Sequence, residues 1–91
     1  SYVSLGVPRP CSTTLIRPEG WQGKWHVEAS YRTGIDEPWV GSWTYSAAGP
    51  SLTLRGLLPY EWRFRFRRGA EGAVERERSV ALRAGDRALV R

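Results

Sequence analysis

Apolar and polar residues alternate with a period of two in two segments of the chain. In residues 25–32 the apolar and aromatic side chains fall on the odd positions, and in residues 60–67 four aromatic side chains fall on the even positions. Successive side chains of a β-strand point to opposite faces, so this period predicts strands with one buried and one solvent-facing side. We therefore expect two half-buried strands whose aromatic positions face the core.

Shorter runs of the same kind predict further strands, separated by segments rich in glycine, proline and aspartate. These strands are expected at residues 2–5, 13–16, 38–46, 51–54, around 80–82 and at 88–90. The strand near 38–46 is expected to place on one face Trp39, Gly41, Trp43 and Tyr45. Residues 71–78 are expected to form a loop that leads into a charged strand start. Turn signals roughly every 8–12 residues, without a helical period, predict an all-β fold, an immunoglobulin-like antiparallel β-sandwich of about seven strands.

Composition places the chain among small globular domains. Its 91 residues match one domain, assigned to residues 1–91, and no apolar run approaches the ~20 residues that span a bilayer. The chain opens without a signal-peptide pattern and contains no methionine, so either an initiator methionine preceded Ser1 or the sequence is a fragment of a longer chain. Cys11 is the only cysteine, which excludes an intrachain disulfide and a cysteine-based zinc cluster.

Three segments of the chain resemble fibronectin type III domains. Residues 25–28 are similar to the family's Tyr-x-Val-x strand, residues 52–59 to its Leu-x-Gly-Leu-x-Pro segment, and residues 62–66 to its aromatic-rich strand. The resemblance implies a sandwich in which Gly56, Leu57 and Pro59 carry the chain from one sheet to the other. It also implies that the aromatic strand pairs with residues 25–32 and with the last long strand. The fold hosts many unrelated roles, so the resemblance names no partner.

One position departs from the family's pattern. The family has a tyrosine four residues after the proline, and its hydroxyl bonds back to the chain. In this sequence Arg63 has that spacing from Pro59, and Trp62 comes one residue earlier. Either this corner is one residue shorter, or the indole N–H of Trp62 makes the bond.

Catalytic chemistry has little support in the sequence. His26 is the only histidine, and its place in the alternation puts it on the polar side of a strand. Asp36 and Glu37 share a turn, where adjacent carboxylates are usually solvated. General acid–base catalysis needs a group in a cleft, and a small sandwich offers none. We therefore expect a protein that is not an enzyme, with no catalytic residue, metal site or cofactor.

An arginine-bearing strand face is the most distinctive candidate site. Arg63, Arg65 and Arg67 are expected to project from the solvent side of residues 60–67, and the chain has a net charge of +5. One interpretation is a ladder of cross-strand ion pairs with glutamates such as Glu75 and Glu77. The other is a basic face that binds an acidic partner or a polyanion, because the guanidinium group binds carboxylates and phosphates through two donors. The arginine excess is also typical of GC-rich genomes.

The five tryptophans are a second candidate feature. Trp25 and Trp62 alternate with core positions and are expected to be buried. Trp21, Trp39 and Trp43 are candidates for an exposed site, because exposed tryptophans mark protein interfaces and platforms for sugar rings. The other interpretation is that these three residues close the ends of a small core.

These features predict a non-catalytic structural or adhesive protein-interaction module. The expected partner is another protein or a second copy of the chain, as in a homo-oligomer or a virion assembly. Size and composition favour a tail, spike or decoration component of a bacteriophage, or a domain of a larger surface protein; a cytoplasmic location stays open. The alternatives are a carbohydrate-binding accessory domain and a polyanion- or nucleic-acid-binding domain. Nucleic acid is disfavoured because the aromatic side chains of the arginine strand point to its opposite face. No membrane insertion is expected.

Overall fold

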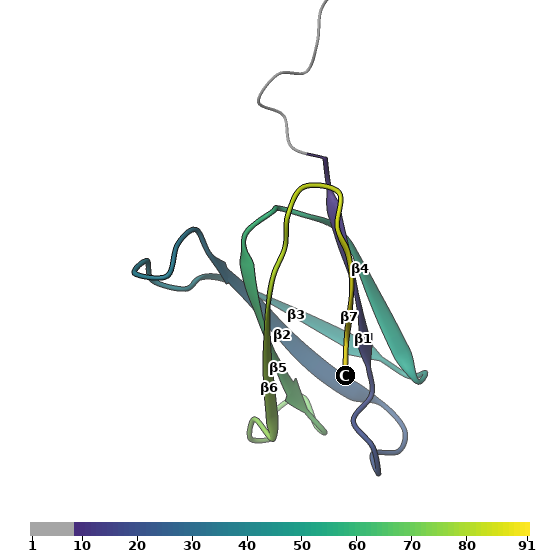
Figure 1. Cartoon of the computed structure of the whole chain (residues 1–91). Coiled ribbons are helices and arrows are strands. Elements are labelled where there is room, and N and C mark those ends of the chain that lie inside the picture. Colours follow the sequence, from purple (N-terminus) through teal and green to yellow (C-terminus); the bar gives the residue numbers. More distant parts are fainter. Residues whose placement is uncertain (1–8) are drawn as a thin grey trace, which may run out of the picture.

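The computed structural model describes residues 9–91, which form seven β-strands (Figure 1). The strands are β1 (Cys11–Ile16), β2 (Trp25–Arg32), β3 (Val40–Ala47), β4 (Ser51–Leu57), β5 (Glu61–Arg67), β6 (Arg76–Ala81) and β7 (Arg87–Val90). No helix that could cross a membrane occurs in this part of the chain. The predicted all-β sandwich of about seven strands is confirmed. The strand expected at residues 2–5 lies outside the described residues.

The larger sheet has four antiparallel strands in the order β3-β2-β5-β6. As expected, the aromatic strand β5 pairs on one side with β2 and on the other with β6. Its register places Phe66 opposite Val27 and Phe64 opposite Ala29, and all four side chains are buried. The period-two alternation of β2 and β5 therefore gives one face to the core and the other to solvent.

The smaller sheet has three strands in the order β4-β1-β7. β4 runs antiparallel to β1, whereas β7 runs parallel to it, with Ser12 opposite Arg87 and Leu15 opposite Val90. The chain reaches β7 from β6 through residues 82–86, so it leaves the larger sheet and ends in the smaller one. Near this crossover the buried Cys11 thiol donates a hydrogen bond to the carbonyl oxygen of Arg83, at 3.0 Å.

The core fills the space between the two sheets. Trp25 is fully buried and stacks on Phe66, with 5.9 Å between ring centroids, and its indole N–H donates to the carbonyl of Gly49 at 2.7 Å. Burying a large apolar side chain of this kind contributes about 1.5–3 kcal/mol. The other buried apolar residues are Cys11, Leu15, Trp21, Val27, Ala29, Leu54, Leu57, Trp62, Phe64, Phe66, Leu82 and Val90.

The chain passes from the smaller to the larger sheet between β4 and β5. Gly56 adopts a positive φ of 73°, and Leu57 is buried beside it. The indole N–H of Trp62 donates to the carbonyl oxygen of Leu58 at 2.8 Å. Of the two alternatives for this corner, the structure has the one in which the tryptophan makes the bond.

β3 corrects one prediction about the tryptophans. Trp43 and Tyr45 share one face of the strand as expected, but Trp39 precedes the strand, and its ring lies against the guanidinium group of Arg63 on the opposite face. The physical reason is Gly41, whose φ of 76° interrupts the alternation where the register between β2 and β3 shifts. A Cβ atom at Gly41 would overlap the Trp43 ring, so any other residue here would have to displace that ring and adopt an unfavourable positive φ.

Candidate binding surfaces

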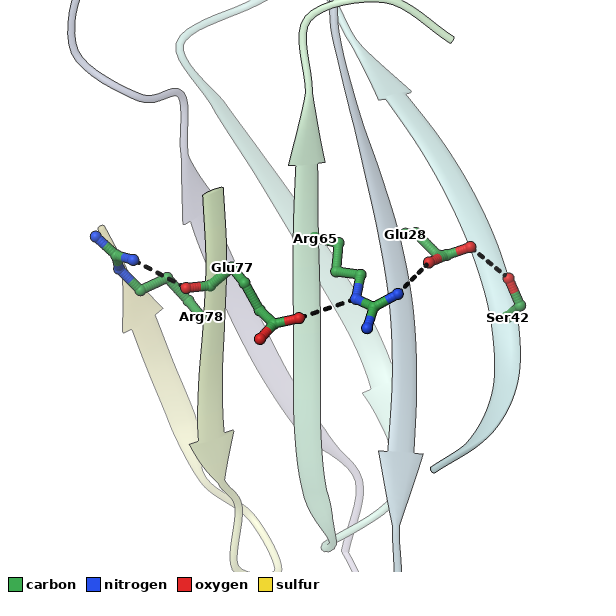
Figure 2. A network of polar contacts seen from close by, with 5 residues as sticks. All are labelled: Glu28, Ser42, Arg65, Glu77 and Arg78. Carbon is green, nitrogen blue, oxygen red and sulfur yellow. Dashed lines mark hydrogen bonds and ion pairs between the residues drawn. The ribbon is translucent and has the colours of Figure 1, made fainter. Parts of the chain in front are cut away.

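Arg65 is held between two carboxylates on the outer face of the larger sheet (Figure 2). Its Nε donates to Oε1 of Glu77 at 2.9 Å, and its Nη1 lies 3.9 Å from Oε1 of Glu28. Oε2 of Glu28 also accepts a hydrogen bond from the hydroxyl of Ser42 at 2.9 Å. The positive charge of Arg65 is therefore balanced within the sheet, by glutamates on the strands to either side.

The neighbouring cationic side chains contact aromatic rings as well as carboxylates. Arg32 and Arg63 each lie 4.6 Å from the centroid of the Trp39 ring, and Nε of Arg32 pairs with Glu61 at 2.6 Å. The Nε atoms of Arg63 and Arg67 are buried, and neither has a hydrogen-bond partner within residues 9–91. The face is thus partly neutralised, and its arginine stems are packed into the surface.

The expected pairing of the arginines with Glu75 and Glu77 is present. Besides the Arg65–Glu77 pair, Arg68 pairs with Glu75 at 3.2 Å and lies 5.1 Å from the ring centroid of Trp21. These contacts favour the cross-strand ladder over an open basic face. Arg63, Arg65 and Arg67 do lie together on one strand face, as the sequence predicted.

The three candidate tryptophans lie in three different environments. Trp21 is only 9% exposed and belongs to the core cluster, so it is no open platform. Trp39 is half-buried beneath two guanidinium groups. Trp43 is 43% exposed and is the only one of the three with an open aromatic surface. The structure does not bring these residues together into one site.

Trp43 instead forms one wall of a concave groove of about 280 Å³, which we call the aromatic groove. Its ring centroid lies 5.9 Å from that of Tyr31 and 5.8 Å from that of Trp62. Leu58, 45% exposed, lies on the lining beside them. The complete lining is Tyr31, Trp43, Tyr45, Arg55, Gly56, Leu57, Leu58 and Trp62.

The aromatic groove lies beside an edge of the larger sheet. Its lining is mostly apolar, with the single cation Arg55 and no carboxylate, histidine or nucleophilic side chain. One wall is formed by β3, one of the two edge strands of the larger sheet, and none of the eight residues of β3 is charged. An uncharged edge strand presents unpaired main-chain donors and acceptors to a partner.

Of the residues that line this groove, the sequence indicated only Trp43 as a candidate binding residue. The remaining residues come from β2, β3, β4, β5 and the β4–β5 crossover, and pattern alone does not show that these segments meet. One available signal is the pair Leu57-Leu58. Adjacent residues of an extended chain point to opposite sides, so if one leucine is in the core the other must face outward.

His26, Asp36 and Glu37, the residues considered for acid–base chemistry, lie at the surface. His26 shares a hydrogen bond with the hydroxyl of Ser46 at 2.9 Å. Asp36 and Glu37 are both exposed in the β2–β3 loop. Residues 9–91 contain no group of three or more histidine, cysteine, aspartate or glutamate side chains placed to hold a metal ion.

Comparison of the chain with known proteins yields no relative. No family model matches it, and no curated protein and no solved structure does so either.

Proposed function

We propose that the chain is a non-catalytic protein-interaction module that binds an extended segment of a partner protein. The segment pairs with the free edge of β3 and places one apolar side chain in the aromatic groove. The observation that carries this proposal is the exposed, uncharged edge strand whose own Trp43 forms a wall of that groove.

Strand addition explains why this edge lacks charged protection. Natural edge strands avoid pairing with other chains by carrying lysine, proline or inward-pointing charges, or by a β-bulge. Between Val40 and Ala47, β3 has none of the first three, and its bulge lies at Gly41, near the start of the strand. Main-chain pairing supplies affinity, and a pocket for an alternate side chain supplies specificity. Burying one large apolar side chain in the groove contributes about 1.5–3 kcal/mol.

We also propose that the module is a distant member of the fibronectin type III kind, with a structural or adhesive role in a virion or at a cell surface. The pairing of β5 with both β2 and β6 supports this proposal, as does the crossover at Gly56, Leu57 and Pro59. Small size, high arginine content and a lone cysteine support the virion or surface context.

The two alternative functions draw less support from the surfaces. A carbohydrate platform would rest on Trp43 alone, because Trp21 is buried and Trp39 is covered by arginines. A polyanion site on β5 would have to compete with the glutamates that already pair with Arg65.

The proposal is tested by selecting binders from a displayed library of random ten-residue segments and measuring their affinity for variants of the chain. Trp43→Ala and Leu58→Glu should each weaken binding at least tenfold. The first substitution removes a wall of the groove, and the second places a negative charge in its lining. Trp39→Ala, which removes an aromatic ring outside the groove, is the matched control and should change the Kd less than twofold. Hydrogen exchange should show new protection of β3 amides when a selected segment binds.

The opposite results would overturn the proposal. A library without binders, binders that are insensitive to Trp43→Ala and Leu58→Glu, or binding without protection of β3 would each do so. A soluble oligosaccharide that quenches tryptophan fluorescence in the native chain but not in Trp43→Ala would show that the aromatic groove binds carbohydrate. Circular dichroism of each variant establishes that it remains folded.

A further inference from the structure

The outer surface of the smaller sheet carries a second hollow, of about 480 Å³, on the face that does not contact the core. We call it the hydroxyl–arginine face. It is lined by Ser12, Thr14, Thr53, Arg55, Arg87, Ala88 and Leu89. The three strands β4, β1 and β7 all contribute to it, so its side chains are positioned by one continuous hydrogen-bonded sheet.

The register of the sheet sets two arginines on either side of a serine. Ser12 of β1 lies opposite Arg87 of β7. On the other edge of β1 the register shifts between Cys11 and Thr13, so that the residues of β4 next to Ser12 include Arg55. Neighbouring strands lie about 4.8 Å apart, which places the two arginines about 10 Å apart across the sheet.

Neither of these arginines is neutralised within the described chain. Among residues 9–91, Arg55 and Arg87 form no ion pair and their side chains form no hydrogen bond, and the lining of the hollow contains no carboxylate. This is the reverse of the environment of Arg65, which has a glutamate on each side. Both arginines are exposed, so their guanidinium groups are available to a ligand.

The hydroxyl groups add donors between the two charges. The hydroxyl oxygens of Thr14 and Thr53 lie 3.0 Å apart and share one hydrogen bond. One hydroxyl of this pair is the donor, which leaves the hydrogen of the other free to donate to an oxygen of a ligand. Ser12 supplies a further hydroxyl in the row of the arginines.

We infer that the hydroxyl–arginine face binds carboxylate side chains of an acidic segment of a partner protein. Guanidinium groups bind carboxylates through paired, charge-assisted hydrogen bonds. Leu89, 55% exposed in the same hollow, provides apolar contact for the partner. Single-stranded nucleic acid is bound largely by stacking of bases on aromatic rings, and no aromatic side chain lines this hollow.

This inference is independent of the proposed function. The aromatic groove lies beside β3, and the two surfaces share only Arg55, which lines both. Substitution of Arg55 and Arg87 together tests the hydroxyl–arginine face, and substitution of Trp43 tests the aromatic groove. The two sets of variants therefore show which of the two proposals fails.

The test is a titration of the isotope-labelled chain with a synthetic ten-residue peptide of alternating glutamate and alanine, followed by NMR at low salt. Amide shifts should concentrate in β1, β4 and β7. Arg55→Gln/Arg87→Gln should weaken the peptide at least tenfold, whereas Lys24→Gln/Arg78→Gln should weaken it less than threefold. Both double variants lower the formal net charge by two, from +5 to +3, so they separate this site from general attraction. Trp43→Ala should leave the affinity unchanged.

Three results would overturn the inference. Equal weakening by the two double variants would show attraction by net charge alone. Shifts centred on β5 and β6 would place the peptide on the other sheet. Tighter binding of a ten-residue thymidine oligonucleotide or a sulfated oligosaccharide than of the peptide would assign the face to a polyanion. All the substituted side chains are exposed, and the dispersion of the amide spectrum establishes that each variant is folded.

Discussion

Thr13 carries a polar atom into the core without a compensating bond. The residue is fully buried in β1, and its hydroxyl oxygen has no hydrogen-bond partner among the residues that the structure describes. An unsatisfied buried hydroxyl costs about 1–3 kcal/mol relative to its state in water. The branched shape and strand preference of threonine therefore suit this position, whereas its hydroxyl group destabilises the folded state.

Replacing Thr13 with valine removes the unsatisfied hydroxyl and keeps the branched shape. We expect Thr13→Val to raise the free energy of unfolding by about 1 kcal/mol. Urea denaturation followed by tryptophan fluorescence measures the change. Thr14→Val is the matched control on the same strand, because the Thr14 hydroxyl is bonded to Thr53, and it should give no gain. A loss of stability in Thr13→Val would mean that the hydroxyl is satisfied.

Trp62 shows the opposite balance, since its polar atom is paired. Trp62→Phe keeps an aromatic ring in the core but removes the N–H that bonds the Leu58 carbonyl, and it leaves a smaller side chain behind. We expect the free energy of unfolding to fall by about 1–3 kcal/mol. Thermal unfolding monitored by circular dichroism measures this loss. Trp43→Phe, at an exposed ring, should cost less than about 1 kcal/mol, and equal losses in the two variants would contradict the role of the bond.

At the residue scale, sequence reasoning succeeded where period-two alternation applied. It identified Trp25 and Trp62 as core residues because both lie in regular strands in which every second residue is apolar or aromatic. It did not distinguish Trp21 from Trp43, because the burial of Trp21 depends on the path of the β1–β2 loop over the core. Loop paths are set by tertiary contacts that a local pattern does not contain.

At the scale of the element, β3 is shaped by a single glycine. The positive φ of Gly41 breaks the strand's alternation, so that Trp39 joins the arginine side while Trp43 lies on the other side, against Tyr31 and Trp62. This bulge creates one wall of the aromatic groove. A prediction from periodicity alone assigns the two tryptophans to the same face, since it assumes an uninterrupted strand.

Gly41→Ala tests this role of the bulge. An alanine here meets two penalties, the positive φ and the overlap of its Cβ with the Trp43 ring, so we expect a loss of at least about 2 kcal/mol and a red shift of the Trp43 emission. Gly23→Ala is the control, since Gly23 also has a positive φ but open space around it. It should cost about 1 kcal/mol without a spectral change. Equal effects of the two substitutions would show that the Trp43 ring does not depend on Gly41.

The sheet membership of β7 marks the limit of prediction at this scale. The sequence indicated a short strand at residues 88–90, and the structure has one at Arg87–Val90. Its partner is β1, more than seventy residues earlier in the chain, and the two run parallel. A short apolar run contains no information about which distant edge it will pair with, because that choice depends on which edge remains free after the other strands have paired.

At the scale of the whole molecule, the two outer faces differ in how their charges are balanced. On the larger sheet, arginines and glutamates alternate across the strands and pair with each other. On the smaller sheet, Arg55 and Arg87 flank hydroxyl groups, and the hollow between them has no carboxylate in its lining. The sequence drew attention to the first face because three arginines lie in one strand, whereas the second pair is separated by more than thirty residues and meets only in the fold.

The parallel pairing of β1 and β7 has a mechanical consequence. The chain enters β1 at the end where Ser12 meets Arg87, and it leaves β7 at the end where Leu15 meets Val90. A pull applied at residues 10 and 91 therefore draws the two strands in opposite directions along their common axis. Such a load acts in shear on every hydrogen bond of the ladder at once, whereas a pull on the adjacent ends of an antiparallel pair breaks its bonds one after another.

Single-molecule pulling measures this difference. Handles at residues 10 and 91 should require a higher rupture force than handles at residues 16 and 51, which lie opposite each other at one end of the antiparallel β1–β4 pair. Equal forces in the two geometries would mean that β7 detaches before the sandwich is loaded. Because forced unfolding is governed by the rate of barrier crossing, a domain of modest equilibrium stability can resist tension along this axis. The smaller sheet thereby joins the two ends of the described chain as a tensile link.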